Sequence, residues 1–191
     1  MDYFDEEIIN ARHIKRRDEY GGIEKGMYIN NIFTSFHEVL LFENKLSIML
    51  PDSFVLMLPE IAEIKYIVGN KPSIIYTSLD TSVNFTFNLY IDTSTEGDIA
   101  LASGMLKRML KNINPAYIFY DDMEIESVDG HKISLFNFKS YAIDDAMYNI
   151  IYLIQIDKYI VQGGFNCMYY DMQEWKRAAI EVIKTLSLKE E

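Results

Sequence analysis

The feature that most constrains the fold is a series of four strand-like segments separated by short polar turns. The segments cover roughly residues 117–127, 132–142, 148–156 and 159–167, and their turns contain Asp129-Gly130, Asp144-Asp145 and Asp157-Lys158. Connections this short join antiparallel neighbours, because a parallel crossover needs a dozen or more residues. The sequence therefore predicts an antiparallel meander of four strands.

Two hairpins are expected before this meander. The apolar runs at 39–42 and 46–50 form the first, and the segments at 74–77 and 83–91 form the second. In the last segment alternate residues are apolar, which is typical of a strand with one buried face. The alternating residues are Val83, Phe85, Phe87, Leu89 and Ile91.

Two longer segments have helical spacing, at about 98–112 and 172–186. The apolar stripe of the first consists of Ile99, Ala102, Met105, Leu106, Met109, Leu110 and Ile113. The stripe of the second consists of Trp175, Ala178, Ala179, Val182, Ile183 and Leu186. We expect both stripes to be buried against the sheet. A short helix starting at Pro59 should also point Ile61 and Ile64 inward.

The segment at 148–156 is apolar on both faces, which suggests layers above and below it. The fold class predicted is α+β, with a central antiparallel sheet and helices on both faces in a three-layer α/β/α sandwich. Residues 1–28 hold seven acidic and five basic residues and end in glycines, so they predict an N-terminal arm. Residues 29–191 are then expected to form a single α+β domain.

Composition limits the compartment and the partners. The net charge of −11 and the pI near 4.7 argue against binding to nucleic acid or to an anionic membrane, and they suit a protein partner with a basic patch. The chain begins MDYFDEEIIN, with acidic residues where a secretory signal needs basic ones. No apolar run approaches the about 20 residues of a membrane span. These observations predict a cytoplasmic chain.

No motif in the sequence predicts an enzyme, a metal site or a cofactor. The histidines His13, His37 and His131 lack the spacing of metal-binding pairs, and we interpret them as surface residues. Gly163-Gly164 does not match a phosphate-binding loop and more often marks a bulge or a close backbone approach. The single cysteine, Cys167, follows a strand and is interpreted as a buried, inert thiol rather than a nucleophile.

An acidic group lies in the first strand of the meander and in the turn that follows it. It comprises Asp121, Asp122, Glu124, Glu126 and Asp129. Carboxylates in such numbers can hold a hard cation. Their alternation with Met123 and Ile125 favours the solvent face of a strand instead.

Tyrosines gather toward the C-terminal end. They are Tyr148, Tyr152, Tyr159, Tyr169 and Tyr170. Tyrosines of this kind can line a ligand groove or a partner surface. Packing within the sheet is the competing interpretation. We take these five residues as the candidate partner surface.

The order of the segments resembles a known family. The residues that carry the resemblance are 50–54 (LPDSF), 84–88 (NFTFN), 163–167 (GGFNC), Trp175 and 185–188 (TLSL). Over about 36–188 the chain resembles the fold of PsbP, an extrinsic subunit of photosystem II, of the Ran-binding Mog protein and of uncharacterised DcrB-like bacterial proteins. The resemblance implies a non-catalytic binding role and assigns no functional residue.

The hypothesis that follows is a non-enzymatic protein-protein interaction module. Two alternatives stay open: a small acidic escort protein for a secreted or assembly partner, and a small-molecule binder that uses an aromatic groove. A flat apolar patch would favour the interaction module or the escort protein. A deep pocket with converging polar groups would favour the small-molecule binder.

Overall fold

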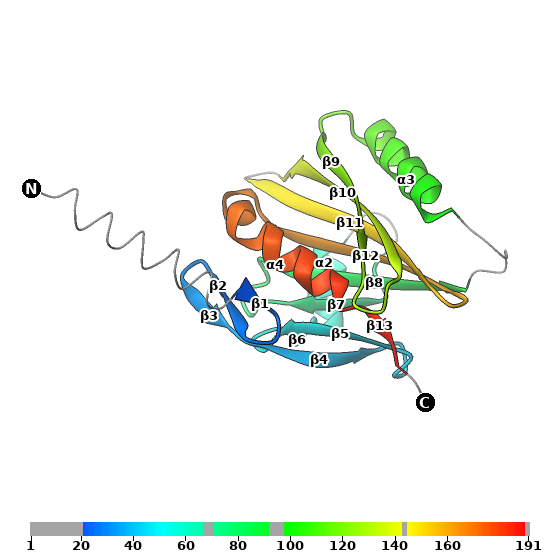
Figure 1. Cartoon of the computed structure of the whole chain (residues 1–191). Coiled ribbons are helices and arrows are strands. Elements are labelled where there is room, and N and C mark those ends of the chain that lie inside the picture. The colour runs from blue at the N-terminus through cyan, green and yellow to red at the C-terminus, as the bar shows by residue number, and fades with distance from the viewer. Residues whose placement is uncertain (1–20, 67–70, 92–97, 143–144, 190–191) are drawn as a thin grey trace, which may run out of the picture.

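The main element of the fold is a seven-stranded antiparallel sheet (Figure 1). The computed structural model describes residues 21–66, 71–91, 98–142 and 145–189. The strand order is β6-β7-β8-β12-β11-β10-β9. The strands are β6 (Val55–Leu56), β7 (Ile74–Thr77), β8 (Asn84–Ile91), β9 (Ile118–Glu126), β10 (Lys132–Tyr141), β11 (Ala146–Ile156) and β12 (Tyr159–Met168). The predicted four-strand meander, now β9 to β12, is confirmed, although its turn at 143–144 lies outside the described residues.

A glycine in β12 sets the packing at the centre of this sheet. Gly163 pairs with Tyr152 of β11, and the tyrosine is fully buried. A Cβ atom on Gly163 would lie 1.9 Å from Cζ of Tyr152. The glycine therefore provides the space that the tyrosine ring occupies, which is the close approach expected of a glycine within a strand.

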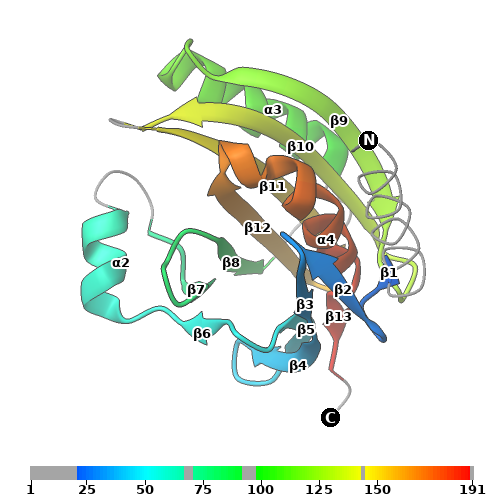
Figure 2. The same ribbon diagram turned by 90° about the vertical axis from the view of Figure 1, so that its left-hand side faces the viewer.

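One face of the large sheet is covered mainly by further β-structure (Figure 2). One small sheet has the order β1-β2-β3 and the other β13-β5-β4. Their strands are β1 (Gly21–Gly22), β2 (Gly26–Ile29), β3 (Ile32–Thr34), β4 (Phe36–Leu41), β5 (Leu46–Pro51) and β13 (Ser187–Leu188). The predicted hairpins at 39–50 and 74–91 are confirmed as β4–β5 and β7–β8.

Helix α4 (Met172–Lys184) lies on the same face and completes the core. It follows a short 3-10 helix, η1 (Tyr169–Asp171). Its predicted apolar stripe is buried, and Trp175 is only 8% exposed. The indole packs against Phe54 and Phe165, with ring centroids 5.9 and 6.0 Å away. The expected burial of this stripe is confirmed.

Helix α3 (Ile99–Ile113) forms where the sequence predicts it, but its apolar stripe is not buried as expected. Asp98 caps the helix by accepting hydrogen bonds from the backbone of Ala100 and Leu101. The helix lies over β10 and β11, yet its only fully buried residue is Ser103. The side chains of Met105, Met109 and Ile113 are at least half exposed. Instead, the side of the helix that carries Ser103 and Lys107 faces the sheet.

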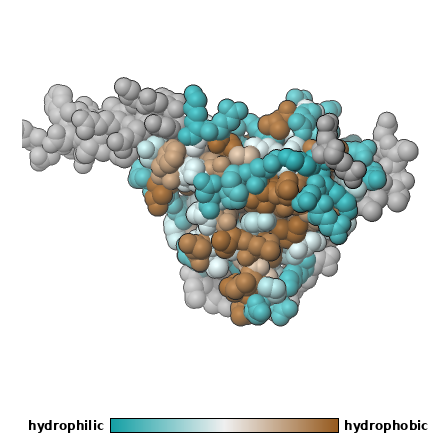
Figure 3. All heavy atoms as spheres, turned by 90° about the horizontal axis from the view of Figure 1, so that it is seen from below, coloured by the Kyte–Doolittle hydropathy of each residue, from teal (hydrophilic) through white to brown (hydrophobic). Residues whose placement is uncertain are grey.

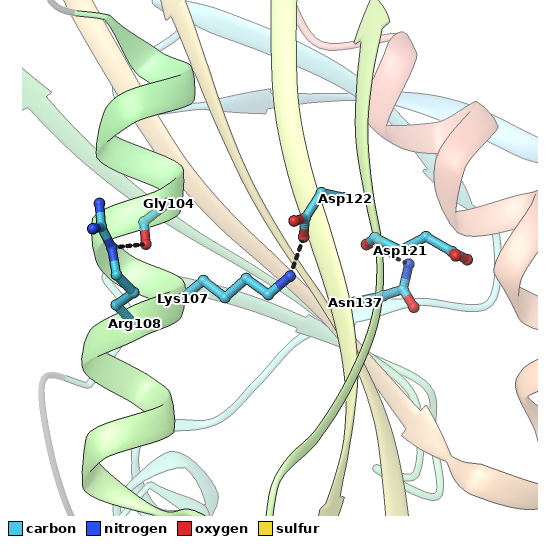
Figure 4. A network of polar contacts seen from close by, with 6 residues as sticks. All are labelled: Gly104, Lys107, Arg108, Asp121, Asp122 and Asn137. Atoms are coloured by element: carbon cyan, nitrogen blue, oxygen red, sulfur yellow. Dashed lines mark hydrogen bonds and ion pairs between the residues drawn. The ribbon is translucent and has the colours of Figure 1, made fainter.

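An ion pair joins Lys107 of α3 to Asp122 of β9, with 2.5 Å between Nζ and Oδ1 (Figure 4). The same ammonium group lies 5.5 Å from the ring centroid of Phe119. With its Ser103 and Lys107 side toward the sheet, the helix leaves much of the apolar stripe facing solvent.

The short helix α2 (Pro59–Lys65) also differs from the prediction. Ala62 is its buried residue, whereas Ile61 and Ile64 are 37% and 74% exposed. Ala62 packs with Met57 and Ile75 beside β7. The expectation that the two isoleucines point inward is wrong, because the seven-residue helix buries only its smallest side chain.

The predicted three-layer α/β/α sandwich with helices on both faces is therefore wrong. The described chain forms three antiparallel sheets, and two of them share one face of the large sheet with α4. The opposite face has no continuous helical layer in the described residues, since α3 spans β10 and β11 and α2 is short. The physical reason is that the N-terminal hairpins cover a face that the sequence interpretation assigned to helices.

The expected domain boundary after residue 28 falls inside β2. Met27 and Ile29 of this strand are both buried in the main core. Residues 21–28 thus belong to the folded domain, and the rest of the predicted arm, residues 1–20, lies outside the described residues.

Gly104 in α3 gives a first prediction. A Cβ atom built on this residue meets no atom within 4 Å. Because glycine is a poor helix former, Gly104→Ala should raise the free energy of unfolding by about 0.5–1 kcal/mol. Chemical denaturation measures the change. A loss of stability would show that α3 needs flexibility at this point.

Candidate functional site

A large cavity lies between the small sheets, the C-terminal half of α4 and the end of β9. Its volume is about 940 Å³. Its charged lining residues are Glu24, Lys25, Glu38, Glu126, Arg177, Glu181 and Lys184. Ser47, Thr185 and Ser187 add hydroxyl groups. The volume suits a small molecule, but none of the described lining residues is aromatic.

Many polar groups of this cavity are already bonded to one another. Lys184 contacts Glu181 at 2.9 Å, and Lys189 contacts Glu38 at 2.9 Å, which lowers the pKa of that carboxyl group. Arg177 donates to the carbonyl of Gly21. A ligand would have to replace these bonds. Four of its seven charged lining residues are thus bonded within the described chain, and its lining does not provide the aromatic groove expected from the sequence.

The five tyrosines predicted as a partner surface are not brought together on one surface. Tyr148 and Tyr152 are fully buried, and neither hydroxyl group has a hydrogen-bond partner among the described residues. Burial raises the pKa of both side chains far above the usual value for tyrosine. Their place on a partner surface is excluded, because the apolar alternation of β11 directs both rings into the core.

The other three tyrosines remain at least partly accessible. Tyr170 is 70% exposed, and Tyr159 is half-buried beside Lys158. Tyr169 stacks under Lys139, whose Nζ lies 4.1 Å from the ring centroid. These contacts hold Tyr169 in place, while Tyr170 is free to meet a partner.

The predicted acidic group is divided between the two sides of β9. Asp122 pairs with Lys107 of α3, and Asp121 pairs with Lys176 of α4 at 3.2 Å. The backbone carbonyl of Asp121 also accepts a hydrogen bond from Asn137 (Figure 4). The carboxylates thus bind lysines from two helices, which fixes the edge strand between them.

Cys167 is fully buried opposite Tyr148 in the sheet, as predicted. Burial, together with the charge of Asp171, raises the pKa of its thiol to about 12. A thiol in this state is not a nucleophile near neutral pH.

This burial predicts the reactivity of the thiol. A thiol reagent at neutral pH should leave the native protein unlabelled and should label it fully after unfolding. The raised pKa means that the folded protein holds the thiol proton more tightly than the unfolded chain. The stabilisation is complete below about pH 9 and is lost as the pH rises toward 12. Rapid, stoichiometric labelling of native protein would contradict this account.

The sequence interpretation missed one segment that exposes several large apolar side chains. Five large apolar side chains on β6, on α2 and on the link between them are 37% to 74% exposed and form what we call the β6–α2 ridge. They are Val55, Leu56, Leu58, Ile61 and Ile64. Figure 3 shows apolar side chains gathered on the underside of the molecule, the side on which β4 and β6 lie in Figure 1. Monomeric proteins rarely expose such a concentration of apolar residues without a binding role.

Local structure explains why the ridge stays uncovered. β6 has two residues and is the edge strand of the large sheet, so in the described chain it has a neighbour on one side only. Glu60 and Glu63 lie on α2 among the apolar residues, and both are exposed. The available sequence signal was a short helix whose isoleucines flank a small alanine, and this pattern gives no indication of which side is buried.

Known structures show the fold but not a family. No family model matches the chain, and no curated protein is similar to it in sequence.

Within the described residues, no helix is both long and apolar enough to cross a membrane.

Three solved structures are similar to this chain. Cyanobacterial PsbP (CyanoP) from Synechocystis matches with a TM-score of 0.60 at 10% identity, over 81% of this chain and 92% of that one. LpqN, involved in cell envelope biogenesis of Mycobacterium tuberculosis, matches with a TM-score of 0.56 at 10% identity, over 85% and 95%. A Bacteroides thetaiotaomicron protein matches with a TM-score of 0.50 at 13% identity, over 81% and 48%. The chain therefore has a PsbP-like fold built on antiparallel sheets.

Proposed function

We propose that this chain is a non-enzymatic protein-binding module whose partner docks on the β6–α2 ridge. The observation that carries the proposal is the exposure of five large apolar side chains within ten residues of one sheet edge. Isolated exposed apolar residues are ordinary on protein surfaces, but a continuous run of them marks a contact site.

Charge defines the kind of partner. The chain as a whole carries −11, whereas α2 itself is locally balanced, because Lys65 follows Glu60 and Glu63 on the same helix and Lys71 lies 3.9 Å from Glu63. A partner with an apolar centre and a basic rim would complement this arrangement. Its association should slow as salt rises, because rim charges act mainly on the association rate. Apolar contacts would hold the complex once formed.

The cavity beside α4 supports the small-molecule alternative less well. Its charged groups are largely paired, and its described lining contains no aromatic residue, so it does not resemble the aromatic groove expected from the sequence. The escort alternative uses the same apolar surface and differs only in the identity of the client. We also propose a cytoplasmic location. A closer relation to the Mog or DcrB-like proteins remains a prediction.

A capture experiment with matched variants tests the proposed function. The ridge variant Leu56→Asp/Ile64→Asp should fold normally, because both side chains are exposed, and should lose the partner. Ile32→Asp is the control, since Ile32 of β3 is 69% exposed and Ile64 is 74% exposed. The three proteins are used as bait in extracts of the source cells.

The result expected is a partner held by the wild-type and control baits and lost from the ridge variant. The purified partner should then bind directly, with an affinity reduced at least about tenfold by the ridge variant. Equal binding to all three baits would contradict a role for the ridge.

A further inference from the structure

The cavity beside α4 adjoins an edge of each of the three described sheets. It is lined by both residues of β1, by Glu126 at the end of β9 and by Ser187 of β13. Each of these strands is the last of its sheet, so in the described chain each pairs on one side only. Figure 2 shows the end of β9, β1 and β13 around the C-terminal part of α4. Edge strands carry backbone N–H and C=O groups that can pair with a further strand.

Part of the backbone at this junction is already hydrogen-bonded. Arg177 of α4 donates to the carbonyl of Gly21 in β1, at 2.9 Å. The amide of Val128, just after β9, donates to the carbonyl of Lys184 at the end of α4, at 2.8 Å. These bonds tie two of the edges to α4. The walls of the cavity are therefore held in place before a ligand binds, which lowers the cost of ordering on binding.

The charged groups of the lining that lack an ion-pair partner are balanced in sign. Glu38 is bonded to Lys189, and Glu181 to Lys184, so a ligand that engaged these groups would break existing bonds. Arg177 bonds a carbonyl, which leaves its positive charge unmatched among the described residues. The lining groups without an ion pair in the described chain are Glu24, Lys25, Glu126 and Arg177. Two are acidic and two are basic, so the complementary ligand carries one charge of each sign.

The remaining lining is aliphatic or carries hydroxyl groups. The aliphatic side chains are those of Ile23, Ile48, Met49 and Val128. The hydroxyl oxygens of Ser47 and Ser187 lie 3.0 Å apart, and one hydrogen bond between them leaves each oxygen able to accept another. A molecule with aliphatic side groups, amide groups and two opposite charges matches this lining.

We propose that the cavity binds a short free peptide in an extended conformation. Its carboxylate end pairs with Arg177, because a guanidinium group can donate two parallel hydrogen bonds to a carboxylate. Its ammonium end pairs with Glu126 on the opposite wall, and its backbone amides pair with the sheet edges between them. The volume of about 940 Å³ lies near the upper limit of drug-sized sites, which suits a few residues rather than one amino acid. The inference goes beyond the proposed function and does not depend on the ridge.

Other classes of small ligand match the lining less well. A nucleotide or another polyanion would place its phosphates beside Glu24 and Glu126, which have no cation to offset them in the described chain. A fatty acid would engage Arg177 and the aliphatic wall but would leave both carboxylates and the sheet edges without partners. A free peptide engages all of these groups.

A pool of free tetrapeptides tests the proposal. Its members have valine, leucine or isoleucine at the two central positions and any residue at the ends. Equilibrium dialysis against the full-length protein, followed by mass spectrometry, identifies the members that bind, and calorimetry measures their affinity. The cavity variants are Arg177→Glu and Glu126→Lys. Controls with the same changes at exposed positions elsewhere are Lys111→Glu in α3 and Glu60→Lys in α2.

Circular dichroism checks that each variant folds. Because Arg177 and Glu126 are exposed, the charge reversals should be tolerated. Arg177→Gln and Glu126→Gln remove the same charges with little change of size, and they replace a reversal that disturbs the fold.

The wild type and both controls should retain the same peptides, with dissociation constants on the order of 10–100 µM, because few hydrogen bonds and exposed charges hold the ligand. Each cavity variant should bind at least about tenfold more weakly. Acetylation of the amino end and amidation of the carboxyl end of the best peptide should weaken its binding to the wild type by a similar factor. Methylation of its central backbone nitrogens should do the same, since it removes the donors that pair with an edge strand.

Four results would overturn the inference. The first is a pool from which the wild type retains no peptide, and the second is equal retention by the wild type and both cavity variants. The third is an N-methylated peptide that binds as tightly as its parent, which would exclude pairing with the sheet edges. The fourth is free valine or leucine bound as tightly as any tetrapeptide, which would assign the cavity to an amino acid.

Discussion

Gly163→Ala is expected to be among the most damaging single-methyl changes in this protein, with a loss of about 3 kcal/mol or more in the free energy of unfolding. The added Cβ would lie 1.9 Å from Cζ and 2.1 Å from the hydroxyl oxygen of Tyr152. Tyr152 is fully buried, so its ring has no free space to move into. Relief would require the two central strands to separate.

The control for this prediction is the same substitution in open space. Gly104→Ala adds the same methyl group to the chain with no atom nearby, so its effect should have the opposite sign. A second check is Gly163→Ala combined with Tyr152→Val, which removes the ring. In a double-mutant cycle the second change should recover part of the loss. A Gly163→Ala protein as stable as the wild type would show that β11 and β12 are not packed as described.

Trp175→Ala should cost about 3–5 kcal/mol of stability, because it removes the largest side chain that joins α4 to the sheet. The indole is 8% exposed and lies between Phe54, just before β6, and Phe165 of β12. Its loss would leave a cavity bounded by rings that cannot collapse together without moving the helix. Urea denaturation followed by circular dichroism measures the effect.

Trp175→Phe serves as the conservative comparison and should cost distinctly less, since one ring keeps most of the contact. The control for position is Tyr170→Ala, which removes an aromatic side chain that is 70% exposed and should change stability by less than about 0.5 kcal/mol. Equal stability of the Trp175→Ala and wild-type proteins would mean that α4 is not anchored at this point.

The strands were predictable because their signals are local. Short turns at Asp129-Gly130 and Asp157-Lys158 specify antiparallel neighbours, and the alternation in 83–91 specifies which residues face the core. The burial of α4 was predictable for a similar reason, since its apolar residues form one narrow stripe. These features require no knowledge of distant parts of the chain.

The orientation of α3 could not be predicted in this way. Its apolar residues cover a wide arc, so periodicity does not fix which part faces the sheet, and in the structure Lys107 on the facing side pairs with Asp122. That pair joins residues in separate elements, so no periodicity reveals it. The sandwich prediction failed for a related reason: the covering of one face by β4 and β5 depends on how the N-terminal hairpin folds over the large sheet.

The candidate site was the least predictable part. The tyrosines of β11 were visible in the sequence, but Tyr148 and Tyr152 are core residues. In the sequence, the residues of the ridge appear only as apolar residues, and residues buried in a core would look the same.

The most direct test of the ridge as a docking surface is methyl NMR of protein labelled at Ile, Leu and Val, titrated with its unlabelled captured partner. The account predicts that the methyl signals of Leu56, Ile61 and Ile64 shift or broaden first, while that of Ile32 stays unchanged. Unchanged ridge signals, with shifts instead at Ile23 and Val128 in the lining of the cavity, would contradict it.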